Sequence, residues 1–260
     1  MKTRYIAILV LAVALGSAVS AQKYSTDAQI DGYRGQVKMV EQTTYEASVS
    51  QDAMVHGDVL ERLRTEYNSK GLRRNMSYLS TEDSLIFRTR YKHDGFGLTT
   101  LEQIVDPAEK IIGRTYYLYD AKNILTESYV EDEERQTENR ILVKYDAKGR
   151  VSARSYNDAF NNVYKREYYT YGADGNVSTT VVYDAEGTKV QEWRYEYDEH
   201  AQPVSQTLYD YTEQEPEVFF SLYKYRYDDQ GNWIQKVEYE LEGASARPTY
   251  ITERRIEYFK

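Results

Sequence analysis

Two short runs of acidic residues are the first groups in this sequence that suggest catalysis. They lie at residues 131–134 and 213–217. Two carboxyl groups about 5 to 10 Å apart suffice to hydrolyse a glycosidic bond, one as the acid and one as the base or nucleophile. Both runs coincide with predicted hairpin turns, where solvated charge is the ordinary state of a loop. The turn interpretation is favoured, and a carbohydrate-active hydrolase of the cell envelope is kept as the alternative function.

Metal binding and nucleophilic catalysis have weaker support. The three histidines, His56, His93 and His200, fall in or beside predicted turns without the spacing of a zinc site, and we interpret them as solvated loop residues. The sequence has no cysteine, no G-x-S-x-G, no glycine-rich phosphate loop and no H-E-x-x-H. Several turn aspartates have the chemistry of calcium ligands, but bonding to their own backbone already explains them. We therefore predict no enzyme activity, no metal and no cofactor. These aspartates are Asp120, Asp146, Asp198 and Asp228.

Aromatic residues form the one pattern that suggests a binding function. The chain has 28 tyrosines, and in residues 192–197 and 223–227 aromatic side chains alternate with charged ones. In a strand this alternation places the aromatic side chains on one face and the charges on the other. The aromatic face serves either as the core of the sheet or as a surface on which a sugar ring stacks. The predicted binding residues are Trp193, Tyr195, Tyr197, Tyr223, Tyr225, Tyr227 and Trp233.

A repeated five-residue unit must position this face. Each copy begins with tyrosine; four have aspartate at the second position and five have glycine at the fifth. In an Asp-x-x-Gly turn the aspartate bonds its own backbone and the glycine adopts a left-handed conformation. Asn123 and Ala201 stand where glycine is expected; asparagine tolerates that conformation, whereas alanine predicts an altered turn near Pro203. The seven copies are residues 67–71, 91–95, 119–123, 145–149, 171–175, 197–201 and 227–231.

The spacing of the copies predicts an antiparallel meander. The intervals between the tyrosines are 24, 28, 26, 26, 26 and 30 residues, and a second turn signal lies near the middle of each interval. All intervals are even, as a continuous sheet requires, because an odd insertion would move one strand's side chains to the opposite face. A period near 26 is also compatible with a β-helix, but tight turns that reverse the chain favour hairpins.

The three-residue loop predicts the partners that flank each turn. An aromatic residue should lie opposite an apolar one in four hairpins, which stabilises each by roughly 0.2 to 1 kcal/mol relative to alanines. These pairs are Tyr119 with Leu125, Tyr145 with Val151, Tyr171 with Val177, and Tyr227 with Trp233.

We predict an all-β fold in which an antiparallel meander of repeated hairpins forms one long, strongly curled sheet or an incomplete barrel. The repeats supply about fourteen strands and residues 36–65 two more, which exceeds what a flat open sheet accommodates. The tyrosines are expected on the concave face. The predicted units are a signal peptide at 1–21, irregular N-terminal strands or a cap at 22–66, and the repeat domain at 67–260. Residues 58–64 are compatible with either a strand or a short helix.

The N-terminus predicts export. Lys2 and Arg4 precede an apolar run and small residues ending at Ala21, as in a secretory signal peptide. Its removal would change the formal charge from -9 to about -11, which disfavours nucleic acid as a partner. No stretch approaches the roughly 20 apolar residues of a membrane helix. The absence of cysteine excludes disulfides and a lipoprotein anchor, so we predict a periplasmic or extracellular protein of a Gram-negative bacterium.

The turn sequence resembles a known repeat. Tyr-Asp-Asp-Gln-Gly-Asn at 227–232, with echoes at 145–149 and 171–176, is similar to the YD repeat of the RHS family and to tyrosine-rich hairpin repeats of small exported proteins of Bacteroidota. The resemblance covers roughly residues 66–260. It implies a β-sheet shell or spiral, with carbohydrate binding proposed for some members. Large members enclose a toxin, and this chain is too short to enclose a cargo.

Together these observations favour an exported, non-enzymatic repeat scaffold that binds a protein or glycan partner through its aromatic face. An outer-membrane barrel would need a lipid-facing apolar band on every strand. The alternation of Glu192, Arg194 and Glu196 with aromatic residues contradicts that requirement.

Overall fold

The computed structural model describes residues 25–50, 53–242 and 245–260. The predicted signal peptide and part of the predicted turn at 242–243 lie outside this range. The described residues form a short helix, α2 (Asp27–Ile30), and sixteen strands. The strands are β1 (Val37–Ser50), β2 (Ala53–Tyr67), β3 (Arg73–Leu79), β4 (Leu85–His93), β5 (Thr99–Val105), β6 (Ile111–Tyr119), β7 (Leu125–Glu131), β8 (Thr137–Tyr145), β9 (Val151–Asp158), β10 (Val163–Tyr171), β11 (Val177–Asp184), β12 (Lys189–Tyr197), β13 (Pro203–Asp210), β14 (Glu217–Tyr227), β15 (Trp233–Glu242) and β16 (Ser245–Tyr258).

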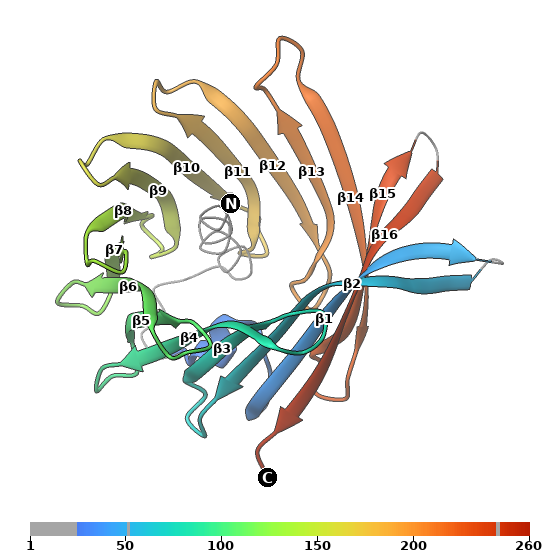
Figure 1. Cartoon of the computed structure of the whole chain (residues 1–260). Coiled ribbons are helices and arrows are strands. Elements are labelled where there is room, and N and C mark those ends of the chain that lie inside the picture. The colour runs from blue at the N-terminus through green and yellow to red at the C-terminus, as the bar shows by residue number, and fades with distance from the viewer. Residues whose placement is uncertain (1–24, 51–52, 243–244) are drawn as a thin grey trace.

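The strands form one antiparallel sheet in chain order, and this sheet closes into a barrel (Figure 1). The all-β meander is thus confirmed, but the expected open sheet or incomplete barrel is wrong. Closure occurs because β1 pairs with β16 from Val37 opposite Tyr258 to Glu46 opposite Tyr250. Because the meander has an even number of strands, its first and last strands run antiparallel. The free backbone N–H and C=O groups along the edge of each can therefore bond to the other. Residues 58–64 belong to β2 and are not helical.

The tight turns form as the sequence predicts. The Asp228 side chain accepts hydrogen bonds from the backbone N–H groups of Gln230 and Asn232, and Gly231 has φ 79°. Asp120, Asp146 and Asp198 make the same pair of bonds in their own turns. The predicted change of turn at Ala201 is wrong. Ala201 adopts φ 59° and keeps the hydrogen bond to the Asp198 carbonyl, because the rest of the hairpin fixes the loop length.

Register confirms the four predicted pairs that flank these turns. Tyr119 lies opposite Leu125, Tyr145 opposite Val151, Tyr171 opposite Val177, and Tyr227 opposite Trp233. Immediately beyond each pair the register shifts by one residue, as in a β-bulge.

One unit of the repeat differs from the prediction. Its turn runs from Asp94 to Gly97, and Gly97, not Gly95, has a positive φ of 85°. His93, and not Tyr91, therefore occupies the position that tyrosine holds in the other units. With His93 in place, the intervals from residue 67 to residue 197 are all 26 residues.

The residues at this position tie the barrel together at one end. Four tyrosine hydroxyls donate to the carbonyl of the first residue of the preceding strand, over 2.6 to 2.9 Å. The equivalent residues Tyr67 and His93 instead bond to Asp31 and Asp27 of the N-terminal segment. The contact thus recurs in four copies, whereas the first two copies hold the N-terminal segment and Tyr227 of the last copy bonds to Asp198. The four tyrosines are Tyr119, Tyr145, Tyr171 and Tyr197.

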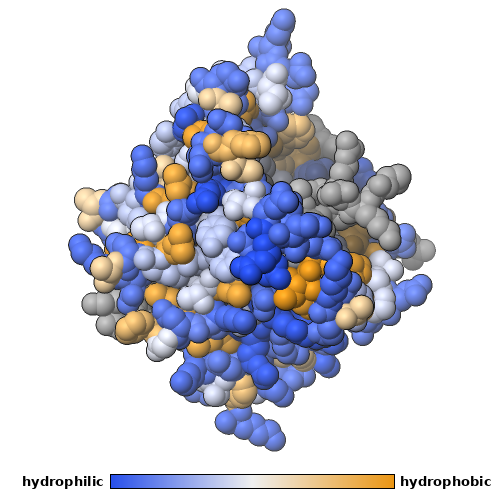
Figure 2. All heavy atoms as spheres, turned by 60° about the vertical axis from the view of Figure 1, so that its left-hand side comes forward, coloured by the Kyte–Doolittle hydropathy of each residue, from blue (hydrophilic) through white to orange (hydrophobic). Residues whose placement is uncertain are grey.

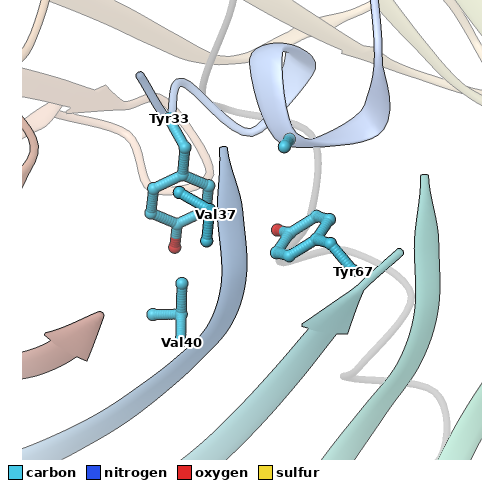
Figure 3. Packing of buried hydrophobic residues seen from close by; sticks show 5 residues of the cluster. Tyr33, Val37, Val40 and Tyr67 are labelled. Atoms are coloured by element: carbon cyan, nitrogen blue, oxygen red, sulfur yellow. The ribbon is translucent and has the colours of Figure 1, made fainter. Parts of the chain in front are cut away.

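The N-terminal segment builds the main buried cluster. Thr26 and Gln29 form a reciprocal capping box on α2, and the segment then leads into β1. Ala28, Tyr33, Val37, Val40 and Tyr67 pack together there (Figure 3). The cluster lies at one end of the barrel, where it joins the segment before β1 to the start of β1 and the end of β2.

Side chains of opposite character line the two faces of the barrel wall. Arg194, Glu196, Lys224 and Arg226 are exposed, whereas the aromatic residues that alternate with them are half-buried. The convex face of a closed barrel is the more exposed, so the aromatic residues lie inside. Figure 2 shows a mostly hydrophilic outer surface with separate hydrophobic patches. Among the described residues there is no helix with the length and apolar character to cross a membrane.

Candidate ligand-binding site

Strands β14, β15, β16 and β1 present polar side chains to the barrel interior at the seam where the sheet closes. Tyr225 lies opposite Lys236, and Lys236 lies opposite Thr252. Arg254, two residues beyond Thr252, therefore shares its face and lies opposite Gln42 of β1. Lys236, Thr252, Arg254 and Gln42 thus bring cations and hydrogen-bonding groups beside the aromatic wall.

Arg254 is the central group of this site. Its guanidinium carbon lies 3.3 Å from the ring centre of Trp233 and 5.1 Å from that of Tyr33. Its Nε donates a 2.9 Å hydrogen bond to Oε1 of Gln42. None of the carboxylates in the described ranges pairs with it. Burial lowers the pKa of Arg254, while its nearness to Tyr33 opposes that shift.

Lys236 is a second cation inside the wall. Its ammonium lies 5.5 Å from the ring centre of Tyr223, and no described carboxylate forms an ion pair with it. Burial lowers the pKa of Lys236, whereas Glu238 and Glu61 act in the opposite direction. Burial also raises the pKa of Glu61 and of Glu238. The seam thus holds two desolvated cations and two acidic groups whose charged forms are disfavoured.

A cavity of about 240 Å³ opens beside Arg254. Its second arginine, Arg73, is neutralised by an ion pair with Asp31, and Asp31 also accepts a hydrogen bond from the Tyr67 hydroxyl. Arg254 is consequently the lining arginine that forms no ion pair with a described carboxylate. The lining residues are Asp31, Tyr33, Val40, Gln42, Leu63, Thr65, Tyr67, Arg73, Met76 and Arg254.

The N-terminal segment is locked against this cavity by paired contacts at both ends. Asp27 bonds to His93 and to the backbone N–H of Arg73, each over 2.7 Å. At the other end, the N–H of Arg34 donates to the Asn232 side chain over 2.7 Å, and Asn232 donates back to the Arg34 carbonyl over 2.9 Å. Tyr33 is therefore held in place over the guanidinium of Arg254.

The predicted binding residues fall into two groups. Tyr225 lies 6.1 Å from Tyr227 and 6.0 Å from Trp233 between ring centres, whereas Tyr195 and Tyr197 pair on β12 at 6.4 Å. Trp193 lies on the face that these β12 residues share.

Several of these side chains already have structural partners. The hydroxyls of Tyr197, Tyr225 and Tyr227 donate to Val177, Pro203 and Asp198. One face of Trp233 is covered by Arg254. The hydroxyls of Tyr195 and Tyr223 interact instead with the side chains of Thr180 and Ser221.

The inward position of Lys236 was not predicted from the sequence because a bulge changes the register. Counting back from the pair Tyr227–Trp233 places Gln235 opposite Tyr225. The register shift between Arg226 and Tyr227 instead places Lys236 there. A charged residue is thereby turned inward, which the prediction of a purely aromatic inner face did not allow. Further along the wall Arg154 and Glu167 also face each other inside.

His93 is less solvated than predicted, whereas His56 is exposed. His93 has a side-chain exposure of 12% and pairs with Asp27, so its interpretation as a solvated loop residue is wrong. His200 packs on Tyr227 with ring centres 4.1 Å apart, and His56 contacts Tyr45 and Glu253. In the part of the chain that the structure describes, no three histidine or carboxylate side chains gather as metal ligands.

Comparison with known proteins supports the fold alone. No protein-family model matches the chain, and no curated protein matches it. A porin-like protein from Bacteroides uniformis is similar in structure, with a TM-score of 0.55 and 12% identity over 90% of this chain and 99% of the other. The Tc holotoxin pore of Photorhabdus luminescens gives a TM-score of 0.29 and 14% identity over 76% of this chain and 12% of the other. The former likeness extends over the whole barrel, and the latter is too low to support an argument.

Proposed function

We propose that the chain is an exported, non-enzymatic scaffold of YD-like hairpin repeats whose inner aromatic face binds a glycan. The observation that carries this proposal is the half-buried aromatic wall inside a closed barrel. The rings of Tyr195 and Tyr223 lie on that wall and are half-buried. Aromatic rings with a polar edge suit the faces and hydroxyls of sugars.

Closure of the sheet favours a glycan over a folded protein as the partner. The inner face is reached only through the ends of the barrel, so a ligand must be narrow. Strands β3 to β14 are each paired on both sides and offer no free edge to which a partner strand could add. A saccharide needs neither a free edge nor a broad flat surface.

The outer face favours contact with water over contact with lipid. Ion pairs cross it on several strands, including Arg64 with Glu41, Arg140 with Glu127, and Arg194 with Glu192. A strand that faces lipid carries an apolar band there, and charge at that depth costs several kcal/mol. We therefore propose a periplasmic or extracellular location, without a lipid anchor.

Screening of the purified chain on a glycan array tests the proposal. We expect saccharide binding that falls roughly tenfold or more in Tyr223→Ala, because stacking on an aromatic ring is lost. Tyr168→Ala is the matched control, since Tyr168 is 46% exposed and faces outward. Equal loss in both variants, or binding to no glycan, would contradict the proposal.

A hydrolase remains the alternative because of one buried carboxyl group. Glu102 accepts a 2.8 Å hydrogen bond from the Tyr117 hydroxyl, and burial raises its pKa, as a general acid requires. Turnover of a bound polysaccharide that disappears in Glu102→Gln would establish the hydrolase. Binding without turnover supports the scaffold.

A further inference from the structure

The seam between β16 and β1 contains a buried cation, Arg254, that forms no ion pair with a described carboxylate. The guanidinium of arginine has five N–H donors, and the contacts of Arg254 with described groups use one of them, on the neutral side chain of Gln42. The rings of Trp233 and Tyr33 lie beside Arg254, with their centres 3.3 and 5.1 Å from the guanidinium carbon. The two Nη atoms of the guanidinium are therefore available to a ligand. Such a ligand would occupy the cavity that Arg254 lines.

Other interior arginines are compensated, which sets Arg254 apart. Arg73 pairs with Asp31. Arg154 lies opposite Glu167 and donates to the Tyr169 hydroxyl over 3.4 Å. A buried cation without a counter-charge lowers stability, and a fold that keeps one beside a cavity is equipped to gain that counter-charge from a ligand.

Lys236 extends the cationic surface in the direction of the aromatic wall. Lys236 lies opposite Thr252, so Arg254 is its diagonal neighbour, and such residues have Cβ atoms about 7 to 8 Å apart. On its other side Lys236 contacts the ring of Tyr223. A ligand held by both cations would therefore also meet the ring proposed to stack on sugar.

We infer that the seam binds the carboxylate of an acidic sugar, with Arg254 as the bidentate partner and Lys236 as the second cation. This inference rests on the proposed glycan-binding function. A carboxylate is planar and matches the guanidinium fork. It also carries a single charge, which matches a site whose acidic neighbours Asp31, Glu61 and Glu238 already act on the two cations without forming ion pairs with them. The size of the cavity favours one sugar ring over a long chain.

Titration of the purified chain with glucuronate, glucose and glucose 6-phosphate tests this inference. We expect glucuronate to bind more tightly than both other sugars. Arg254→Gln should weaken glucuronate binding about tenfold or more, because a charge-assisted hydrogen-bonded pair is lost. Arg254→Lys keeps the positive charge but loses the two-pronged guanidinium. Its affinity for glucuronate should lie between those of the unmodified chain and of Arg254→Gln. Arg255→Gln is the matched control, since this neighbour points outward and its side chain is 67% exposed.

Fluorescence supplies a readout that depends on the site itself. Arg254 lies against Trp233, so glucuronate should change the emission of Trp233 in a Trp193→Phe background, where it is the remaining tryptophan. Far-UV circular dichroism checks that each variant is folded. If Arg254→Gln does not fold, Arg254→Lys and the Trp233 signal decide the question.

The outcomes separate the two proposals. Equal binding of glucose and glucuronate, unaffected by Arg254→Gln, would overturn the carboxylate inference and leave glycan binding intact. Tighter binding of glucose 6-phosphate than of glucuronate would overturn the choice of carboxylate over phosphate. Absence of binding by all three sugars, together with an array signal from neutral glycans, would overturn this inference alone. Absence of binding to the array as well would overturn both.

Discussion

The repeat wall and the closing seam of this barrel use the same kinds of residue differently. In the repeat wall, β5 to β12, tyrosine hydroxyls are bonded to carbonyls, and Arg154 and Glu102 have polar partners inside. In the seam, β14 to β16 with β1, Arg254 and Lys236 are buried without a described carboxylate partner. The polar groups of the wall are therefore satisfied within the fold, whereas the two cations of the seam remain available to a ligand.

The ion pair that anchors the N-terminal segment should give the largest effect on stability. Arg73→Ala removes the partner of the buried Asp31 carboxylate, and we expect a loss of about 3 to 5 kcal/mol in the free energy of unfolding. Urea denaturation measures it. Arg74→Ala, at the exposed neighbouring position, is the control and should change stability little. Similar losses in both variants would show that the segment is not held by this pair.

The tyrosine ties of the repeat wall should each contribute less. Tyr145→Phe removes the hydroxyl that donates to the Leu125 carbonyl over 2.8 Å, and we expect a loss of about 1 kcal/mol. Tyr168→Phe on the outer face should be close to neutral in the same denaturation experiment. An unchanged free energy of unfolding for Tyr145→Phe would show that these hydrogen bonds do not stabilise the wall.

Ala201 offers a test in the opposite direction. Its φ of 59° is strained for alanine, so Ala201→Gly should raise the free energy of unfolding by about 0.5 to 1 kcal/mol. Ala121→Gly, within a turn of the same type but without a positive φ, should bring no gain. Thermal denaturation of the two variants compares them directly. A gain in the control alone would contradict the strain argument.

The smallest effect concerns the pH dependence of the wall. Burial raises the pKa of Glu102 above its ordinary value of 4.5, so the folded chain binds a proton that the unfolded chain releases. Stability from this group is present below pH 4.5 and is lost as the pH rises toward the folded pKa. Glu102→Gln has no ionisable group here and does not lose stability in this way. The stability of Glu102→Gln relative to the unmodified chain should therefore increase between pH 4 and pH 7. A constant difference in stability would show that Glu102 does not cause the pH dependence.

Local patterns were sufficient to predict the hairpins but not their closure. The Asp-x-x-Gly turns and the four flanking pairs follow from interactions within a few residues, and all four pairs occur. The pairing of Val37 with Tyr258 depends on the cumulative curvature of sixteen strands, which no local pattern contains. The open sheet was expected for that reason.

The candidate site was only partly predictable for a related reason. Tyr223 and Tyr225 were identified because strand alternation is regular where no bulge intervenes. Lys236 was missed because one bulge shifts the register by one residue and so places Lys236, not Gln235, opposite Tyr225. His93 was misjudged because Gly95 was taken for the turn glycine, although a constant interval of 26 residues would have identified it.

The hydrogen bond between Arg254 and Gln42 joins residues 212 positions apart in the chain. Hairpins made of neighbours in the sequence assemble in microseconds, whereas contacts between distant segments must wait until the intervening chain is ordered. The seam is thus the last part of the molecule expected to assemble during folding. A truncated or half-folded chain would possess most of its hairpins and still lack the site, so ligand capture would report that the entire polypeptide has reached its native state.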